Sequence, residues 1–499
     1  MPLRDRRHFL ATTLAGGAAL LFLPRGLRGA ARGRPGALAT IQVAQIGCGR
    51  MGREDMKGVL ASPLARVVAV CDVDAKRLAA GKALAEEHYQ KRGESDVQVA
   101  AVADVRELLA RADIDALVVS TPDHSHAWIA VAAALAGKHL YVQKPLTYDV
   151  GEALALRRAV QAKGVVLQVG SQQRSSAPWP AFRIAAAAVR AGRIGRVQEV
   201  RIGLGTDTPS GKKPAPSAPP PHLDYDRWLG PAPEADYMEG RVHPQESLSG
   251  RPGWITTESY GLGMITNWGA HHLDIAQWAL RMELSGPRTV EARADFMQDD
   301  QWTVHRGYHV EIGYAGGTGG GAASGASGAG GGGAASGGSA ASGGDAASGG
   351  PRVVLDDRFE VGLEFVGEEG TLFCTRGSGQ VTASDPNAAG SKAALRASDA
   401  KLLLPLPESA ETLLPSSDHY ANWLEAIRDR KAPVAPVDQA ARSLTVCYLS
   451  WLAMRLGRKL EWDPTTERFV GDDEANGRLA RPRRKSEFDV DALLKTAGI

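Results

Sequence analysis

The stretch Ile41-Gln-Val-Ala-Gln-Ile-Gly-Cys-Gly-Arg-Met-Gly52 decides the fold of this 499-residue chain. An apolar run that ends in a glycine-rich turn is typical of a strand that passes into a helix around a phosphate. Gly47 permits the tight turn, Gly49 lets the backbone approach a pyrophosphate, and Gly52 allows close packing of helix on strand. The pattern alone is weak in a chain with 58 glycines, so the rest of the sequence has to support it.

An acidic residue after the second expected strand supplies that support. The strand covers residues 65–72, and Asp72 follows the third glycine at the distance of a ribose-binding carboxylate. Such a carboxylate accepts hydrogen bonds from both adenosine ribose hydroxyls and repels a 2′-phosphate, which favours NAD. Lys76 and Arg77 lie close behind and keep NADP open. The alternative for Asp72 is an ordinary turn or N-cap residue.

Strand-like and helix-like segments alternate through the first third of the chain. The unbroken apolar run at 116–122 is typical of a buried parallel strand. The alternation predicts an α/β fold with a doubly wound parallel sheet of the Rossmann type over residues 40–166. The other expected strands lie at 97–102 and 139–142, and the expected helices at 54–62, 75–91, 105–111 and 128–136.

Two short segments follow strand ends, where ligands bind in such sheets. They are Ser120-Thr-Pro-Asp-His-Ser-His126 and Tyr141-Val-Gln-Lys-Pro145. Lys144 comes directly after a buried strand, and Pro145 cannot continue a ladder, so the turn aims the lysine. We expect both segments to face the cofactor. The alternative is that Lys144 is a surface lysine in an ordinary turn.

A polar stripe marks the second half of the chain. Asn267, His271, Asp274 and Trp278 fall at i, i+4, i+7 and i+11, so they share one face of an expected helix. A helix that faces a core normally carries apolar residues there. The stripe is therefore either a buried polar network or a functional site.

These motifs together resemble the Gfo/Idh/MocA family of glucose–fructose oxidoreductase and inositol dehydrogenase. The resemblance covers most of residues 41–460 and rests on Gly47-x-Gly49-x-x-Gly52, Asp72, Thr121-Pro122-x-x-x-His126, Gly137-Lys138-His139 and Lys144-Pro145. It implies a second, α+β domain at 167–460 with a large, open, mostly antiparallel sheet that makes homo-oligomer contacts. It also implies a cofactor site made of Gly47, Gly49, Arg50, Met51, Gly52, Asp72, Thr121, Pro122, His126, Gln143 and Lys144.

Two positions depart from the family pattern. Gln143 stands where the family usually has a glutamate before the catalytic lysine. Asn267 stands where the family has an aspartate, four residues before an acid/base histidine that His271 matches. An asparagine cannot act as a base or raise the pKa of a histidine by charge.

The resemblance nevertheless implies catalysis. We expect Lys144 and His271 to be catalytic, with His272 in reserve and Asp274 able to orient an imidazole. The substrate contacts implied are Arg174, Asn267 and His271. The resulting expectation is an NAD(P)-dependent oxidoreductase of a sugar, polyol or glycoside.

Two alternatives stay open. One is a redox-neutral enzyme that uses NAD to cleave a glycoside. The other is a non-catalytic sugar-binding relative, which Gln143 and Asn267 would suit.

The first 35 residues indicate export. Arg6-Arg-His-Phe-Leu10 precedes a modest apolar stretch and resembles a twin-arginine signal, although a basic tail or a Sec-type signal would also read this way. Because that pathway moves folded proteins, the twin-arginine machinery would be a partner, the location periplasmic and the cofactor tightly bound. Residues 316–350, almost purely Gly, Ala and Ser, are expected to be a flexible insertion, and 461–499 a charged surface tail.

Composition limits the other functions. The formal net charge of +2 gives no reason to expect nucleic acid or an anionic membrane as a partner. The four cysteines are widely spread and show no metal-ligand spacing, so no metal site is expected.

Overall fold

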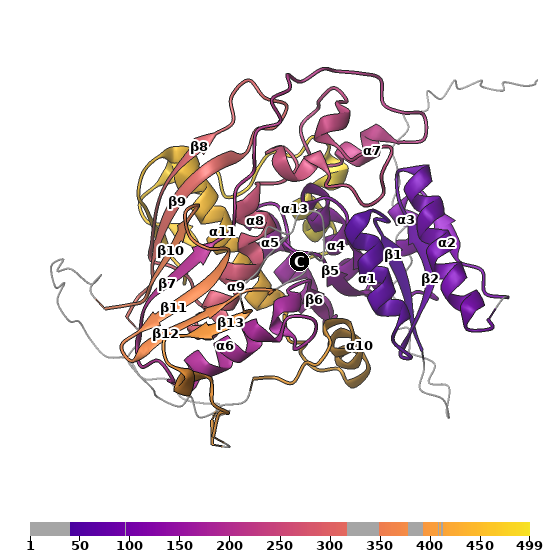
Figure 1. The fold of residues 1–499 in the computed structure, drawn as a ribbon. Coiled ribbons are helices and arrows are strands. Elements are labelled where there is room, and N and C mark those ends of the chain that lie inside the picture. The colour runs from indigo at the N-terminus through magenta and orange to yellow at the C-terminus, as the bar shows by residue number, and fades with distance from the viewer. Residues whose placement is uncertain (1–39, 95, 317–348, 378–392, 408, 411–412) are drawn as a thin grey trace, which may run out of the picture. The chain divides into compact units, whose positions relative to one another are not determined.

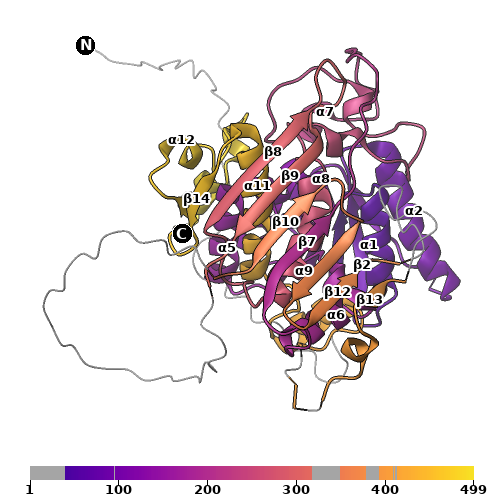
Figure 2. The ribbon, with the colours of Figure 1, turned by 60° about the vertical axis from the view of Figure 1, so that its left-hand side comes forward.

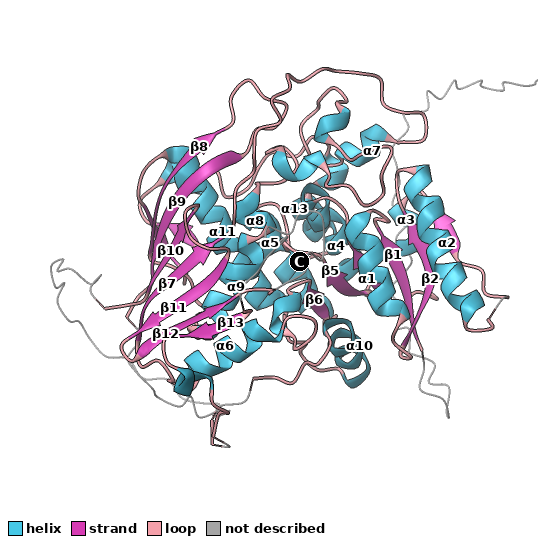
Figure 3. Cartoon of the chain, in the orientation of Figure 1, coloured by secondary structure: helices cyan, strands magenta, loops and turns pink. Residues whose placement is uncertain are grey.

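The computed structural model describes residues 40–94, 96–316, 349–377, 393–407, 409–410 and 413–499. The predicted signal at 1–35 and nearly all of the predicted insertion at 316–350 lie outside the described residues. Figures 1 and 3 show the described part as two sheets with helices between and around them. None of its helices is both long enough and apolar enough to cross a bilayer.

The first sheet has six parallel strands in the order β3-β2-β1-β4-β5-β6. Apolar side chains cover it on both faces, which is why β4 is buried at every residue. Its strands are β1 (Ile41–Ile46), β2 (Ala65–Cys71), β3 (Ala100–Val102), β4 (Ala116–Val119), β5 (His139–Val142) and β6 (Leu167–Val169). Its helices are α1 (Arg50–Leu60), α2 (Ala75–Lys91), α3 (Val105–Leu109), α4 (His126–Leu135) and α5 (Val150–Lys163).

The second sheet has nine strands in the order β13-β12-β11-β7-β10-β9-β8-β14-β15. All its strand pairs are antiparallel except β7 with β10. The strands are β7 (Val197–Gly203), β8 (Thr289–Phe296), β9 (His305–Gly313), β10 (Arg352–Asp356), β11 (Gly362–Gly367), β12 (Gly370–Cys374), β13 (Leu395–Ala397), β14 (Leu460–Asp463) and β15 (Arg468–Phe469). The predicted fold class, a Rossmann sheet plus a mostly antiparallel sheet, is confirmed.

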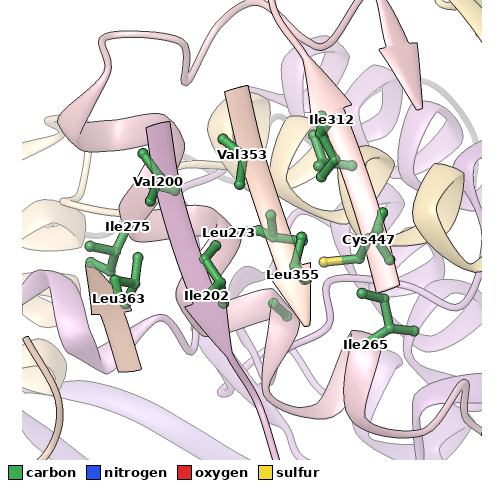
Figure 4. Close-up of a cluster of buried hydrophobic side chains, with 14 of the residues drawn as sticks. Val200, Ile202, Ile265, Leu273, Ile275, Ile312, Val353, Leu355, Leu363 and Cys447 are labelled. Atoms are coloured by element: carbon green, nitrogen blue, oxygen red, sulfur yellow. The ribbon is translucent and has the colours of Figure 1, made fainter. Parts of the chain in front are cut away.

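One face of the second sheet is covered by α6 (Pro180–Arg190), α9 (Gly269–Ala279) and α11 (Val437–Leu456), as Figure 2 shows. Figure 4 shows the contact: Ile202 and Leu355 from the strands meet Leu273 of α9 and Cys447 of α11. Alternate strand residues on the other face form ion pairs, such as Arg201 with Glu199 and with Glu364. This alternation is that of a sheet with one buried face.

The remaining helices are short, apart from α10 (His419–Asp429), which has 11 residues. The short ones are α7 (Tyr225–Leu229), α8 (Met264–Asn267), α12 (Asp473–Asn476) and α13 (Val490–Thr496). The residues expected to form a surface tail instead fold back on the molecule: β14 pairs with β8, and α13 packs on α4 and α5. Arg483 pairs with buried Asp149 of the first sheet's domain, with 3.0 Å between guanidinium nitrogen and carboxylate oxygen.

The expected helix over the polar stripe is interrupted. It forms as α8 and α9, with a break at Trp268, and Gly269 begins the second helix. Glycine is a poor helix former, which suits a break in the helix at this point.

Candidate active site

The glycine turn has the geometry of a phosphate cradle. Gly47 has φ +83°, and a Cβ there would lie 2.6 Å from the Ser120 carbonyl oxygen. A Cβ on Gly52 would lie 1.8 Å from the Gly47 oxygen, so α1 packs against β1 only with glycine at this position. A Cβ on Gly49 would meet nothing within 4 Å. The open space at the start of α1, beside its free N–H groups, is what a pyrophosphate requires.

Asp72 stands beside this turn at the end of β2. Its carboxylate accepts hydrogen bonds from the backbone N–H of Cys48 (2.7 Å) and of Asp74 (2.9 Å), and burial raises its pKa. Carboxylate oxygens have further lone pairs, so the same group can accept from a ribose.

A cavity of about 450 Å³ begins at these groups and runs between the two sheets. This volume lies within the range of ligand pockets. Its nucleotide end is lined by Gly47, Gly49, Arg50, Met51, Asp72, Thr121, Pro122 and His126. Its other end is lined by Asp123, Gln143, Lys144, Trp179, Asn267, Trp268, His271, Arg376 and Tyr420. The structure therefore brings most of the predicted site residues together around one cavity.

Lys144 joins the two halves of this wall. Its Nζ donates a hydrogen bond to Asn267 Oδ1, at 2.9 Å, across 123 positions of sequence. Burial lowers the pKa of Lys144 to about 8, and the nearby charge of Asp123 partly opposes that effect. Burial in turn raises the pKa of Asp123 to about 7, while Lys144 works to lower it. Burial and the charges of neighbouring groups together therefore set the pKa of this lysine.

His271 lies on the same wall. Burial and the charge of Arg376 hold its pKa well below the usual 6.5, so the imidazole is neutral near pH 7. Its Nδ1 and the amide nitrogen of Asn267 are buried and have no hydrogen-bond partner in this structure. Buried polar groups of this kind normally have partners, which a substrate hydroxyl would supply.

Arg174 and Asp274 lie away from the cavity wall. Arg174 and Asp274 form a buried pair, with distances of 2.6 and 2.7 Å between guanidinium and carboxylate, and Asp274 also accepts from Ser443. Asp274 thus pairs with Arg174 and does not take the expected role of orienting an imidazole. Arg174 does not line the cavity, so the expected substrate contact is not supported. The polar stripe is partly site and partly buried network.

Two histidines have supporting positions. His272 packs against the rings of Phe182 and Trp268, away from the cavity wall, so the reserve role predicted for it has no geometric support. His126 lines the cavity, but its two ring nitrogens face the carbonyls of Thr121 and Pro145 at 2.9 and 2.8 Å. It fixes the two turns that surround the cofactor site.

Several cavity residues are not evident from the sequence. Arg376 lies over the rings of Trp179 and Trp268, with its guanidinium carbon 3.7 and 4.2 Å from their centroids. Asp123 sits inside the quoted segment 120–126, yet nothing in the sequence distinguishes it from its neighbours. Tyr420 comes from α10, and no local pattern marks it. These residues reach the cavity only through tertiary packing.

The cavity offers the contacts that a dinucleotide needs. The glycine cradle, the carboxylate of Asp72 and the N-terminus of α1 supply the contacts that a pyrophosphate and a ribose need. Among the described residues, no group of three or more His, Cys, Asp or Glu side chains is placed to hold a metal ion.

Comparison with known proteins agrees with this arrangement. A model of the NAD-binding Rossmann fold of the Gfo/Idh/MocA oxidoreductase family matches residues 41–171. A model of that family's C-terminal alpha/beta domain matches residues 208–319 and 397–489. Together the two matches cover more than half of the chain.

Individual relatives are more distant. Inositol 2-dehydrogenase from Rhizobium meliloti is 32% identical over 191 residues, which make up 38% of this chain and 50% of that protein. Levoglucosan dehydrogenase from Pseudarthrobacter phenanthrenivorans is 32% identical over 168 residues, or 33% of this chain and 40% of that protein. The chain spans about half the length of the curated relatives it matches.

A solved structure shares the fold. The crystal structure of the WlbA dehydrogenase from Bordetella pertussis, in complex with NADH and UDP-GlcNAcA, has a TM-score of 0.54 at 16% identity. The structural match covers 85% of this chain and 98% of the WlbA chain. With both sheets, the cofactor cradle and the two family models in agreement, the chain belongs to the Gfo/Idh/MocA oxidoreductase family.

Proposed function

We propose that this protein transfers a hydride between a tightly bound nicotinamide cofactor and a hydroxyl or carbonyl of a sugar, polyol or glycoside. One observation carries the proposal: Lys144 bonds Asn267 at 2.9 Å in the same cavity as His271, at the end away from Asp72. A nucleotide anchored at Asp72 and the glycine turn would place its nicotinamide near this group. The names of the relatives, inositol and levoglucosan dehydrogenases, support a carbohydrate substrate.

The side chains divide the work as follows. The bound nicotinamide supplies the hydride chemistry. Lys144, in its protonated form, donates a hydrogen bond to the reacting oxygen and stabilises negative charge that develops there. His271, neutral near pH 7, accepts the hydroxyl proton when the substrate is oxidised and returns it in reduction. Asn267 holds the lysine and uses its free amide nitrogen for a neighbouring substrate oxygen.

The contacts around Asp72 favour NAD over NADP. Arg77, which with Lys76 is one of two nearby basic residues that could receive a 2′-phosphate, pairs with Asp74 at 3.0 Å and donates to the Pro244 carbonyl at 2.7 Å. His243 also bonds Asp74, at 3.0 Å. These bonds would have to break before Arg77 turned to a phosphate, and the Asp72 carboxylate would repel it.

Location and assembly belong to the same proposal. The sequence at 1–35 supports export through the twin-arginine machinery to the periplasm. An enzyme outside the cytoplasm has no pool of free NAD, so tight retention would be needed. The second sheet, with its open face of ion pairs, is the surface we propose for homo-oligomer contacts.

One observation favours a second candidate function, redox-neutral cleavage of a glycoside. Asp123, with a pKa raised to about 7, holds a proton in part of the population at neutral pH. A protonated carboxyl beside Lys144 has the chemistry of a general acid for a departing glycosidic oxygen.

The test starts from purified protein. We would denature it, identify the released nucleotide, and follow its oxidation state at 340 nm after incubation of the native protein with polyols, anhydro-sugars and glycosides. We expect stoichiometric NAD, reduced by one of these compounds, and a loss of at least about 10³-fold in turnover for Lys144→Ala. Release of free sugar with no net reduction would favour cleavage. Binding of sugar without either reaction would identify a non-catalytic relative.

A further inference from the structure

The side chain of Asp55 is a buried acid that the proposed chemistry does not use. It lies on α1, fully buried, three positions after Gly52. Its carboxylate accepts three hydrogen bonds, from Ser120 Oγ at 2.6 Å, Gln143 Nε2 at 2.8 Å and Tyr420 OH at 2.8 Å. A buried carboxylate is costly unless its acceptor sites are filled, and here three donors from three different elements fill them.

Two glycines make room for this network. A Cβ on Gly58 would lie 2.3 Å from the ring of Tyr420, and a Cβ on Gly170 would lie 2.8 Å from Gln143 Oε1. Tyr420 also stacks on Tyr141, with 5.2 Å between the ring centroids. The absence of a side chain at Gly58 on α1 and at Gly170 after β6 thus leaves room for Tyr420 and Gln143 to reach Asp55.

Gln143 connects Asp55 to the reacting lysine by two hydrogen bonds. A carboxylate can only accept, so the amide nitrogen of Gln143 must face Asp55 and its oxygen must face the other way. That oxygen accepts a hydrogen bond from the backbone N–H of Lys144, at 3.2 Å. The orientation of the turn before Pro145 is therefore set by Asp55.

Asp55 also acts through its charge. Lys144 faces positive charge from Arg50 on α1 and from Arg376, and negative charge from Asp123 and Asp55. Burial raises the pKa of Asp55 to about 6, against the three hydrogen bonds that lower it, so the group is mostly ionised at neutral pH. Gln143 itself carries no charge, so Asp55 supplements the negative charge of Asp123, which has the larger effect on the pKa of the lysine.

We infer that Asp55 is a positioning residue for Lys144: acting through Gln143, it fixes the lysine turn, and its negative charge adds to that of Asp123 near the lysine. This inference rests on the proposed function only in treating Lys144 as the lysine that takes part in the reaction. The contact network and its effect on Lys144 are testable without any substrate.

The decisive measurement is the protonation of Lys144. The full chain would be treated with acetic anhydride across a pH series, and the acetylated fraction of Lys144 read by mass spectrometry. We expect Asp55→Asn to lower the pH of half-labelling by about one unit, because an opposing charge has been removed. In the double variant Asp55→Asn/Gln143→Glu, an amide at position 55 donates to a carboxylate at position 143. The hydrogen bond therefore forms in the opposite direction, and one negative charge is kept. Its half-labelling pH should return to within a few tenths of wild type.

A matched control distinguishes an effect specific to the position of Asp55 from the general effect of losing a buried carboxylate. Asp149→Asn removes an equally buried carboxylate, which pairs with Arg483 and lies off the cavity wall. It should lower the melting temperature and leave Lys144 labelling unchanged. An unchanged labelling curve in Asp55→Asn, or an equal shift in Asp149→Asn, would overturn the inference.

Turnover provides the second measurement. If the wild type reduces its nucleotide with a sugar, Asp55→Asn should lower kcat by about 10- to 100-fold with a smaller change in KM, since misplacement acts on the reacting group. The double variant should recover most of that loss. A wild type without any turnover would sink the proposed function, while the labelling series would still decide the role of Asp55.

Discussion

The two ends of the cavity are built in different ways. The nucleotide end comes from one short part of the chain, where Gly47, Gly49, Gly52 and Asp72 shape backbone around a phosphate and a ribose. The reacting end comes from side chains that are far apart in sequence, such as Lys144 and Asn267, which meet at 2.9 Å. Local backbone geometry is enough to hold a pyrophosphate and a ribose. The reacting end instead requires side chains that tertiary packing brings together.

The largest effect should come from breaking the support of the reacting end. Asp274→Ala leaves Arg174 buried and without its carboxylate, which should cost about 3–5 kcal/mol of unfolding free energy. Urea unfolding measures this loss. The double variant Asp274→Ala/Arg174→Met should recover part of it, because no unpaired charge remains. A loss below about 1 kcal/mol in Asp274→Ala would contradict the buried pair.

The glycine turn offers a sharper contrast within the nucleotide end. Gly49→Ala adds a methyl group to open space, so the fold should persist, while the nucleotide should bind about tenfold or more weakly because the methyl group occupies pyrophosphate space. Gly52→Ala adds the same group 1.8 Å from a carbonyl oxygen, and should lower stability by about 1–3 kcal/mol. Thermal unfolding and nucleotide content after purification separate the two. Equal behaviour of the two variants would count against the cradle.

A smaller effect should appear in the pH dependence of the reacting end. Lys144 has a pKa lowered to about 8, chiefly by burial, so its hydrogen-bond donation is lost as pH rises through that value. His271 has a pKa well below 6.5, so it stays a neutral base down to lower pH. We therefore expect kcat/KM for oxidation to be flat from about pH 6.5 to about pH 8 and to fall above. Asp123→Asn should move the alkaline limb to lower pH, and a limb that rises with pH would assign Lys144 as the base instead.

What could be predicted from the sequence also differs between the two ends of the cavity. The glycines, Asp72 and the alternation of strands and helices predicted the Rossmann sheet, because these signals are local. The polar stripe was harder to interpret. Helical periodicity placed Asn267, His271 and Asp274 on one face. Asn267 and His271 line the cavity, but Asp274 instead pairs with Arg174 from a distant part of the chain.

The sequence by itself determined the nucleotide fold, the family and the lysine turn, because each rests on short local motifs. Tertiary structure alone decided which polar residues face the cavity and which neutralise each other in the core. It also decided that Asp55, unmarked in the sequence, lies one hydrogen bond behind Gln143. Those outcomes depend on which elements pack together, and the charge and burial that set the chemistry arise only once they do.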